Sequence, residues 1–193
     1  MTTLAERMAD LLSGDVERAE AAAAALPADN AEAAFTALLP LLQDKNEDTR
    51  WWAVRGLAGF NTPAASEQLT AALGDASPSV QQCAALALSQ RIWPACVAPL
   101  AALLASRDGL LARIAGDALV AQAGEAVPAL IAVLEGQSSP SARVEAARAL
   151  ALIGDTRAIP ALFKLLDSES ALLEHWASEG LQKMGVGIAF FTP

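Results

Sequence analysis

The sequence of 193 residues contains no tyrosine, one histidine and two cysteines. Nothing at helical spacing around His175 completes an imidazole metal site or a Ser-His-Asp arrangement. Cys83 and Cys96 are too few for a disulfide framework or a metal quartet, and we interpret them as small buried residues in a reducing compartment. Glycine-rich phosphate loops and dinucleotide fingerprints are also absent. We therefore expect no catalytic residue, no metal, no cofactor and no enzymatic activity.

Basic residues are scarce as well. The chain has 13 Lys and Arg against 22 Asp and Glu, which gives a net charge of −9. Nucleic acids and anionic membrane surfaces require a basic protein surface, so we expect neither as a partner. The sequence has no run of 18 apolar residues, so we predict no membrane span. The N-terminal stretch MTTLAERMADLLSGD has no apolar run flanked by basic residues, so we expect no signal peptide and a cytoplasmic protein.

Alanine is abundant, and it recurs with a period. Hydrophobic residues make up 54% of the chain, and the excess of alanine over aromatic residues favours helices over strands. Small and apolar residues repeat every 31 residues, which indicates stacked copies of one unit. The Ala53 series is Ala53, Ala84, Ala115, Ala146 and Ala177, and the Leu57 series is Leu57, Leu88, Leu119, Leu150 and Leu181.

Helix-start residues keep the same step. Each repeat has a residue that caps a helix N-terminus, and these are Asp15, Asn46, Ser77, Asp108, Ser139 and Ser170. Pro78 and Pro140 follow two of them, at the first helical position, where a missing N–H costs nothing. We predict an all-α fold, a right-handed α-α superhelix of about six hairpins, each with an outer and an inner helix. The solenoid would span residues 1–186, and an apolar tail would cover residues 187–193.

The fourth unit, SSPSARVEAARALALIGDTRAIPALFKLLDSE (138–169), resembles a HEAT repeat of the short phycobilisome-lyase type. The resemblance rests on Arg143, on the alanines and Leu150 after it, on Gly154 and Asp155, and on Pro160 and the leucines of the next helix. It implies a scaffold that holds another protein on a concave surface lined by the inner helices. Some members of the family are similar to subunits of bilin lyases, which attach or detach tetrapyrroles on phycobiliproteins.

Helical spacing separates a buried stripe from a candidate binding face on the inner helices. Trp52 lies at the edge of the stripe and is expected to be structural. Two series point away from it: the Trp51 series is Trp51, Gln82, Arg113, Val144 and His175, and the Arg55 series is Arg55, Leu86, Asp117, Arg148 and Glu179. The Val54 series (Val54, Ala85, Gly116, Ala147 and Ser178) is expected to complete the face. Alternatively, tight curvature closes the groove and these residues contact one another.

The resemblance and this face together predict a non-enzymatic scaffold that binds another protein. Arg55, Arg113 and Arg148 suggest a partner with an acidic patch or a carboxylate-bearing ligand. The alternative is a bilin-lyase-like or phycobilisome-associated chaperone, in which the propionates of a bilin meet these arginines. The apolar tail either folds back as a cap or docks into another subunit, which would make an oligomer.

Overall fold

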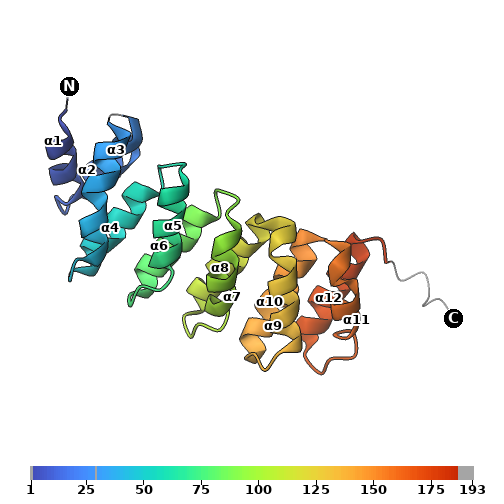
Figure 1. Ribbon diagram of the computed structural model, residues 1–193. Coiled ribbons are helices and arrows are strands. Elements are labelled where there is room, and N and C mark those ends of the chain that lie inside the picture. Colours follow the sequence, from blue (N-terminus) through green and yellow to red (C-terminus); the bar gives the residue numbers. More distant parts are fainter. Residues whose placement is uncertain (1, 29, 187–193) are drawn as a thin grey trace. The chain divides into compact units, whose positions relative to one another are not determined.

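A computed structural model describes residues 2–28 and 30–186, and the predicted tail at 187–193 lies outside them. The described residues form twelve α-helices and no strand, arranged as six hairpins along the chain (Figure 1). The predicted all-α solenoid of helical hairpins is therefore confirmed. The helices group into two compact units, Met1–Arg91 and Ile92–Pro193, a division that the regular repeat does not signal.

The first unit contains three hairpins. Its outer helices are α1 (Leu4–Leu11), α3 (Ala31–Leu38) and α5 (Pro63–Ala72), and its inner helices are α2 (Val16–Ala25), α4 (Glu47–Leu57) and α6 (Pro78–Leu88). The inner helices pack side by side, α2 on α4 and α4 on α6. Two short 3₁₀ helices flank α3: η1 (Leu26–Ala28) lies between α2 and α3, and η2 (Leu39–Gln43) lies between α3 and α4.

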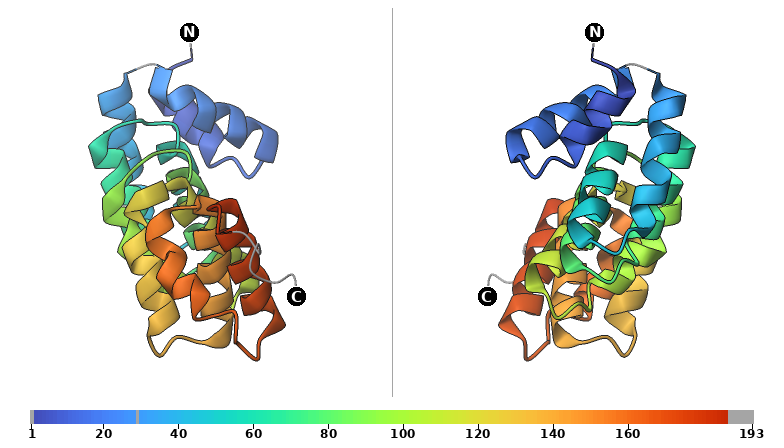
Figure 2. Two further views of the ribbon diagram at one scale, coloured as in Figure 1. Left: turned by 90° about the vertical axis from the view of Figure 1, so that its right-hand side faces the viewer. Right: turned by 90° about the vertical axis from the view of Figure 1, so that its left-hand side faces the viewer.

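The second unit repeats this plan. Its outer helices are α7 (Val97–Leu103), α9 (Val127–Glu135) and α11 (Ile159–Phe163), and its inner helices are α8 (Gly109–Ala121), α10 (Pro140–Ile153) and α12 (Ala171–Lys183). The 3₁₀ turns η3 (Pro94–Cys96), η4 (Ala123–Glu125) and η5 (Thr156–Ala158) each precede an outer helix. The layer of inner helices and the layer of outer helices can be followed within the unit in Figure 2.

Within the described residues, no single helix is both long and apolar enough to cross a membrane. A bent pair, Gly109–Ala121 with Ala123–Glu135, meets the criterion by length and composition alone, with an angle of 114° between its halves.

All six predicted capping residues are the N-caps of the inner helices. Four of them accept a backbone N–H through the side chain, as expected. Ser77 and Ser170 do not, and for these two the predicted capping bond is wrong. Here a polar side chain two residues earlier accepts the N–H of the cap residue instead: Asp75 for Ser77 at 2.8 Å, and Ser168 for Ser170 at 3.2 Å.

The small-residue pattern forms the seam between inner helices. Every member of the Ala53 series is 0% exposed, and the Leu57 series is at most 3% exposed. Because alanine is small, adjacent inner helices can approach closely while the leucines fill the space toward the outer layer. The repeat therefore marks the buried core, as predicted.

Basic side chains also tie three of the repeats to the preceding one. The guanidinium of Arg91 donates to the carbonyls of Ala58 at 2.6 Å and Phe60 at 2.7 Å, which lie at the end of the preceding inner helix. Arg157 donates to the carbonyl of Gly124 at 2.8 Å, and Lys183 donates to that of Leu152. Cations at a helix C-terminus satisfy orphan carbonyls and complement the helix dipole.

We expect Arg91→Met to lower the free energy of unfolding by about 2 kcal/mol, because it removes charged donors from carbonyls at a helix end. Urea denaturation followed by circular dichroism measures the loss. Arg107→Met is the matched control, since Arg107 is exposed and should change stability by less than about 0.5 kcal/mol. Equal effects for the two variants would show that the carbonyl contacts of Arg91 contribute nothing.

Candidate functional site

Four of the predicted face residues meet in one groove of the first unit. Trp51 and Arg55 from α4, with Gln82 and Leu86 from α6, line a hollow of about 450 Å³. Small residues also line it, among them Ala58, Cys83 and Ala87. The leucine side chain is 54% exposed, although it lies on a helix that is otherwise largely buried. The groove is thus an apolar and aromatic surface that is open to solvent.

The one arginine of this groove is already paired. Arg55 donates from Nε to Oε1 of Glu20 at 3.1 Å, and its Nη2 lies 2.7 Å from Oε2. Glu20 comes from α2 and also lines the groove. Sequence reasoning missed Glu20, yet it lies one repeat of 31 residues before Trp51 and could have been found by extending that series backward.

The two adjacent tryptophans occupy neighbouring hollows. Their rings contact each other edge to face, with centroids 4.8 Å apart. Trp51 faces the groove, whereas Trp52 lines a second hollow of about 350 Å³ together with Val16 and Asp48. Both rings are half-buried. Half-burial of Trp52 agrees with its predicted place at the edge of the buried stripe.

The second unit uses its predicted face residues differently. Arg148 on α10 is only 1% exposed. Its Nη1 lies 2.8 Å from Asp117 on α8, and its Nε donates to Glu145 at 2.8 Å. Arg113, which is half-exposed, lies 3.8 Å from Asp117 and 4.0 Å from Glu145. The expectation that Arg148 is presented to a partner is therefore wrong, because its guanidinium is enclosed by the protein's own carboxylates.

Gly116 explains why Arg148 can be buried. A Cβ at Gly116 would lie 2.8 Å from Nη2 of Arg148 and 3.2 Å from Glu145, so a side chain here would force the guanidinium to shift. Gly116 belongs to the Val54 series, which was expected on the open face. The structure corrects this, since Val54, Ala85, Gly116 and Ala147 are all buried. Neighbouring inner helices cover more of each helix than a single-helix projection predicts.

The remaining face residues of the second unit do not join the ion network. Val144 is half-buried on α10, and His175 and Glu179 are exposed on α12. His175 contacts Trp176 edge to face at 5.1 Å. Within residues 2–28 and 30–186, no three His, Cys, Asp or Glu side chains are arranged to hold a metal ion.

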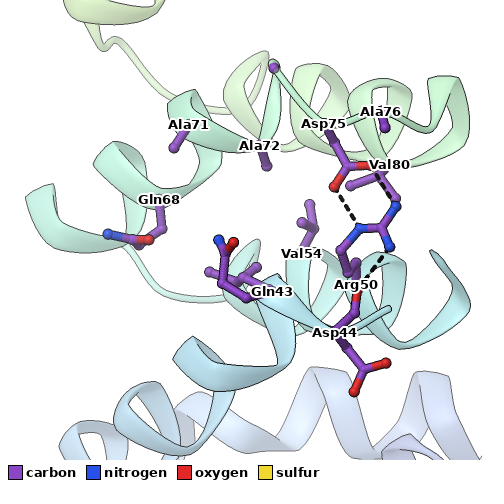
Figure 3. A pocket seen from close by; sticks show the side chains of 12 residues that line it. Gln43, Asp44, Arg50, Val54, Gln68, Ala71, Ala72, Asp75, Ala76 and Val80 are labelled. Carbon is purple, nitrogen blue, oxygen red and sulfur yellow. Dashed lines mark hydrogen bonds and ion pairs between the residues drawn. The ribbon is translucent and has the colours of Figure 1, made fainter. Parts of the chain in front are cut away.

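Another pocket of the first unit is lined by an ion pair that joins α4 to the segment before α6. Arg50 donates through Nε and Nη2 to both carboxylate oxygens of Asp75, at 2.7 and 2.9 Å, and through Nη1 to the carbonyl of Asp44 at 2.9 Å. Figure 3 shows this pair at one end of a pocket of about 380 Å³, with the amide of Gln68 at the other. The hydrogen bonds from Arg50 hold the pKa of Asp75 below its usual range.

Both cysteines are buried and unpaired with each other, as predicted. Burial raises the pKa of Cys83 to about 12 and that of Cys96 to about 11. A thiol with so high a pKa forms almost no thiolate at neutral pH, so neither residue is an activated nucleophile.

The sequence matches the family described as HEAT repeats over residues 35–120 and 125–187. The comparison with curated proteins finds no match. Among solved structures, an engineered protein is 24% identical, with a TM-score of 0.56 over 96% of this chain and 98% of its own. A designed armadillo repeat protein in complex with the peptide (KR)4 is 20% identical, with a TM-score of 0.54 over 94% and 99% of the two chains.

The complex of CpcE and CpcF of phycocyanin lyase from Nostoc sp. PCC7120 also matches. It is 22% identical, with a TM-score of 0.55, and the match covers 96% of this chain and 78% of that one. At these identities the three structures establish the fold that the chain shares with them.

We predict that Asp117→Asn combined with Glu145→Gln lowers the free energy of unfolding by about 3 kcal/mol, because Arg148 then stays charged and buried without a carboxylate. Adding Arg148→Met should recover more than half of that loss. Urea denaturation measures both. Glu179→Gln on the exposed side of α12 is the control. A triple variant that is less stable than the double variant would contradict a buried ion pair at Arg148.

Asp75→Asn should destabilise the protein at neutral pH, and the difference from the wild type should shrink in acid. The pKa of Asp75 in the folded protein lies below the ordinary value of 3.8 for an aspartate, so its contribution is fully present above that pH and is lost as the pH falls through the folded pKa. Urea denaturation from about pH 7 to about pH 2 tests this. Glu67→Gln, at an exposed carboxylate of α5, is the control. A difference that grows in acid would contradict the assignment.

Proposed function

Because the chain belongs to the HEAT-repeat family, we propose that it is a non-enzymatic scaffold that binds another protein through the exposed face of its inner helices. The groove beside Trp51 carries this proposal. Tryptophan is among the residues most enriched in binding hot spots, and Leu86 exposes more than half of its side chain there. Packed helices hold these side chains in place, which lowers the entropy that binding costs.

The chemistry of the other side chains supports a non-catalytic role. The thiols of Cys83 and Cys96 have raised pKa values, and the arginines of the face are paired with carboxylates. The only histidine, His175, is exposed beside Trp176. We place the scaffold in the cytoplasm, because buried free thiols suit a reducing compartment.

We do not retain an acidic patch as the feature that the partner presents. That expectation relied on open arginines, whereas Arg55 is bound to Glu20 and Arg148 is enclosed by Asp117 and Glu145. A partner carboxylate would have to displace one of these side chains.

A second proposal is a bilin-lyase-like or phycobilisome-associated chaperone that binds a tetrapyrrole or a phycobiliprotein. The similarity in fold to the CpcE–CpcF complex of phycocyanin lyase supports it. The pairing of the arginines counts against bilin propionates in the groove, and we rank this proposal second. A shift in visible absorbance when a bilin is added would support it.

Trp51→Ala combined with Leu86→Ser should weaken partner binding at least tenfold, because it removes an aromatic anchor and its apolar neighbour. Affinity capture from the source cells with isotope-labelled quantification compares the variant with the wild type. Phe163→Ala, at an exposed phenylalanine of outer helix α11, is the matched control. Thermal melts establish that each variant is folded. Equal recovery of every captured protein by the wild type and the double variant would overturn the proposal.

A further inference from the structure

Carboxylates outnumber basic residues in the unit that carries the groove. Residues 1–91 contain 12 Asp and Glu against 6 Lys and Arg. The arginines of this unit are largely used within the fold: Arg18 pairs with Asp10, Arg50 with Asp75 and Arg55 with Glu20. Each pair uses one carboxylate as well as one arginine, so the excess of carboxylates is unchanged and this unit stays negatively charged.

Three of these carboxylates lie along the face that carries the groove. Glu20 lines the groove itself, and its side chain is 41% exposed. Glu17 and Asp48 are exposed in the first turns of α2 and α4, and they lie one repeat of 31 residues apart. Asp48 also lines the hollow beside Trp52, whose ring contacts that of Trp51. Because Glu20 forms an ion pair with Arg55, the negative charge beside the apolar surface comes from the exposed Glu17 and Asp48.

We propose that the groove between α4 and α6 binds a basic, partly apolar segment of another protein; this rests on the proposed scaffold function. Apolar side chains of the segment pack on Trp51 and Leu86. Its Lys or Arg side chains lie over the ring of Trp51 and against the exposed carboxylates of Glu17 and Asp48.

Charge also distinguishes this occupant from the others. A second copy of the chain carries the same net charge of −9, so its approach is opposed by repulsion. An anionic ligand meets the same carboxylates, and Arg55, the cation of the groove, is held by Glu20. A wholly polar basic segment would leave the exposed surface of Leu86 uncovered.

A displayed library of random dodecapeptides tests the proposal. Selection uses the immobilised full chain, with subtraction against the folded Trp51→Ala/Leu86→Ser variant. We expect the enriched peptides to carry net positive charge and at least one large apolar residue. The affinity of a selected peptide for the wild type should fall at least tenfold for the double variant and should weaken as salt is added.

Substitution of the carboxylates separates charge from packing. The paired variant Glu17→Gln/Asp48→Asn should weaken binding of a selected peptide and flatten its salt dependence. Trp51→Ala should weaken binding of the peptide without flattening its salt dependence. Glu32→Gln with Glu67→Gln, at exposed carboxylates of the outer helices α3 and α5, is the control and should leave both quantities unchanged.

The outcomes separate this inference from the proposed function. Enriched acidic or neutral peptides that require Trp51 and Leu86 would overturn the inference and leave the scaffold function standing. Basic peptides whose binding does not depend on salt would also overturn the inference and leave the scaffold function standing. Failure to enrich any peptide over the Trp51→Ala/Leu86→Ser variant would overturn both the inference and the scaffold function.

Discussion

The close approach of neighbouring inner helices is the constraint on which the rest of the structure depends. An alanine at the same position of each repeat, fully buried from Ala53 to Ala177, brings the helices of a unit together. At that distance a side chain can reach its counterpart one repeat away. The ion pairs Arg55–Glu20 and Arg148–Asp117 form for this reason, and they join residues 35 and 31 positions apart. Small core residues thus determine which charges meet on the surface.

The basic residues illustrate the consequence. Arg91, Arg157 and Lys183 satisfy carbonyls of the preceding repeat, while Arg50, Arg55 and Arg148 satisfy carboxylates. Cations in these contacts stabilise the stack and are not offered to a partner. The groove beside Trp51 is therefore an aromatic and apolar surface whose one arginine is held by Glu20.

The fold was largely predictable because its signals are local and repeated. Capping residues begin the inner helices, proline occupies their first turn, and alanine and leucine mark the seam, all at one spacing. The site was predictable in part. The series through Trp51 and Leu86 identified the groove, since exposure on a helix follows from its spacing. Glu20, Glu145 and the burial of Gly116 were missed because they depend on the neighbouring helix.

The sequence by itself determined the helices, their caps, the repeat and the side of each inner helix that carries Trp51, because these follow from residue type and period. The tertiary structure decided the state of the arginines. Arg148 is buried against Gly116 on the adjacent helix, where a Cβ would force its guanidinium to shift, and Arg55 is neutralised since α2 brings Glu20 beside it. A helical projection describes one helix at a time, whereas the charge that a partner meets is set by how two helices pack.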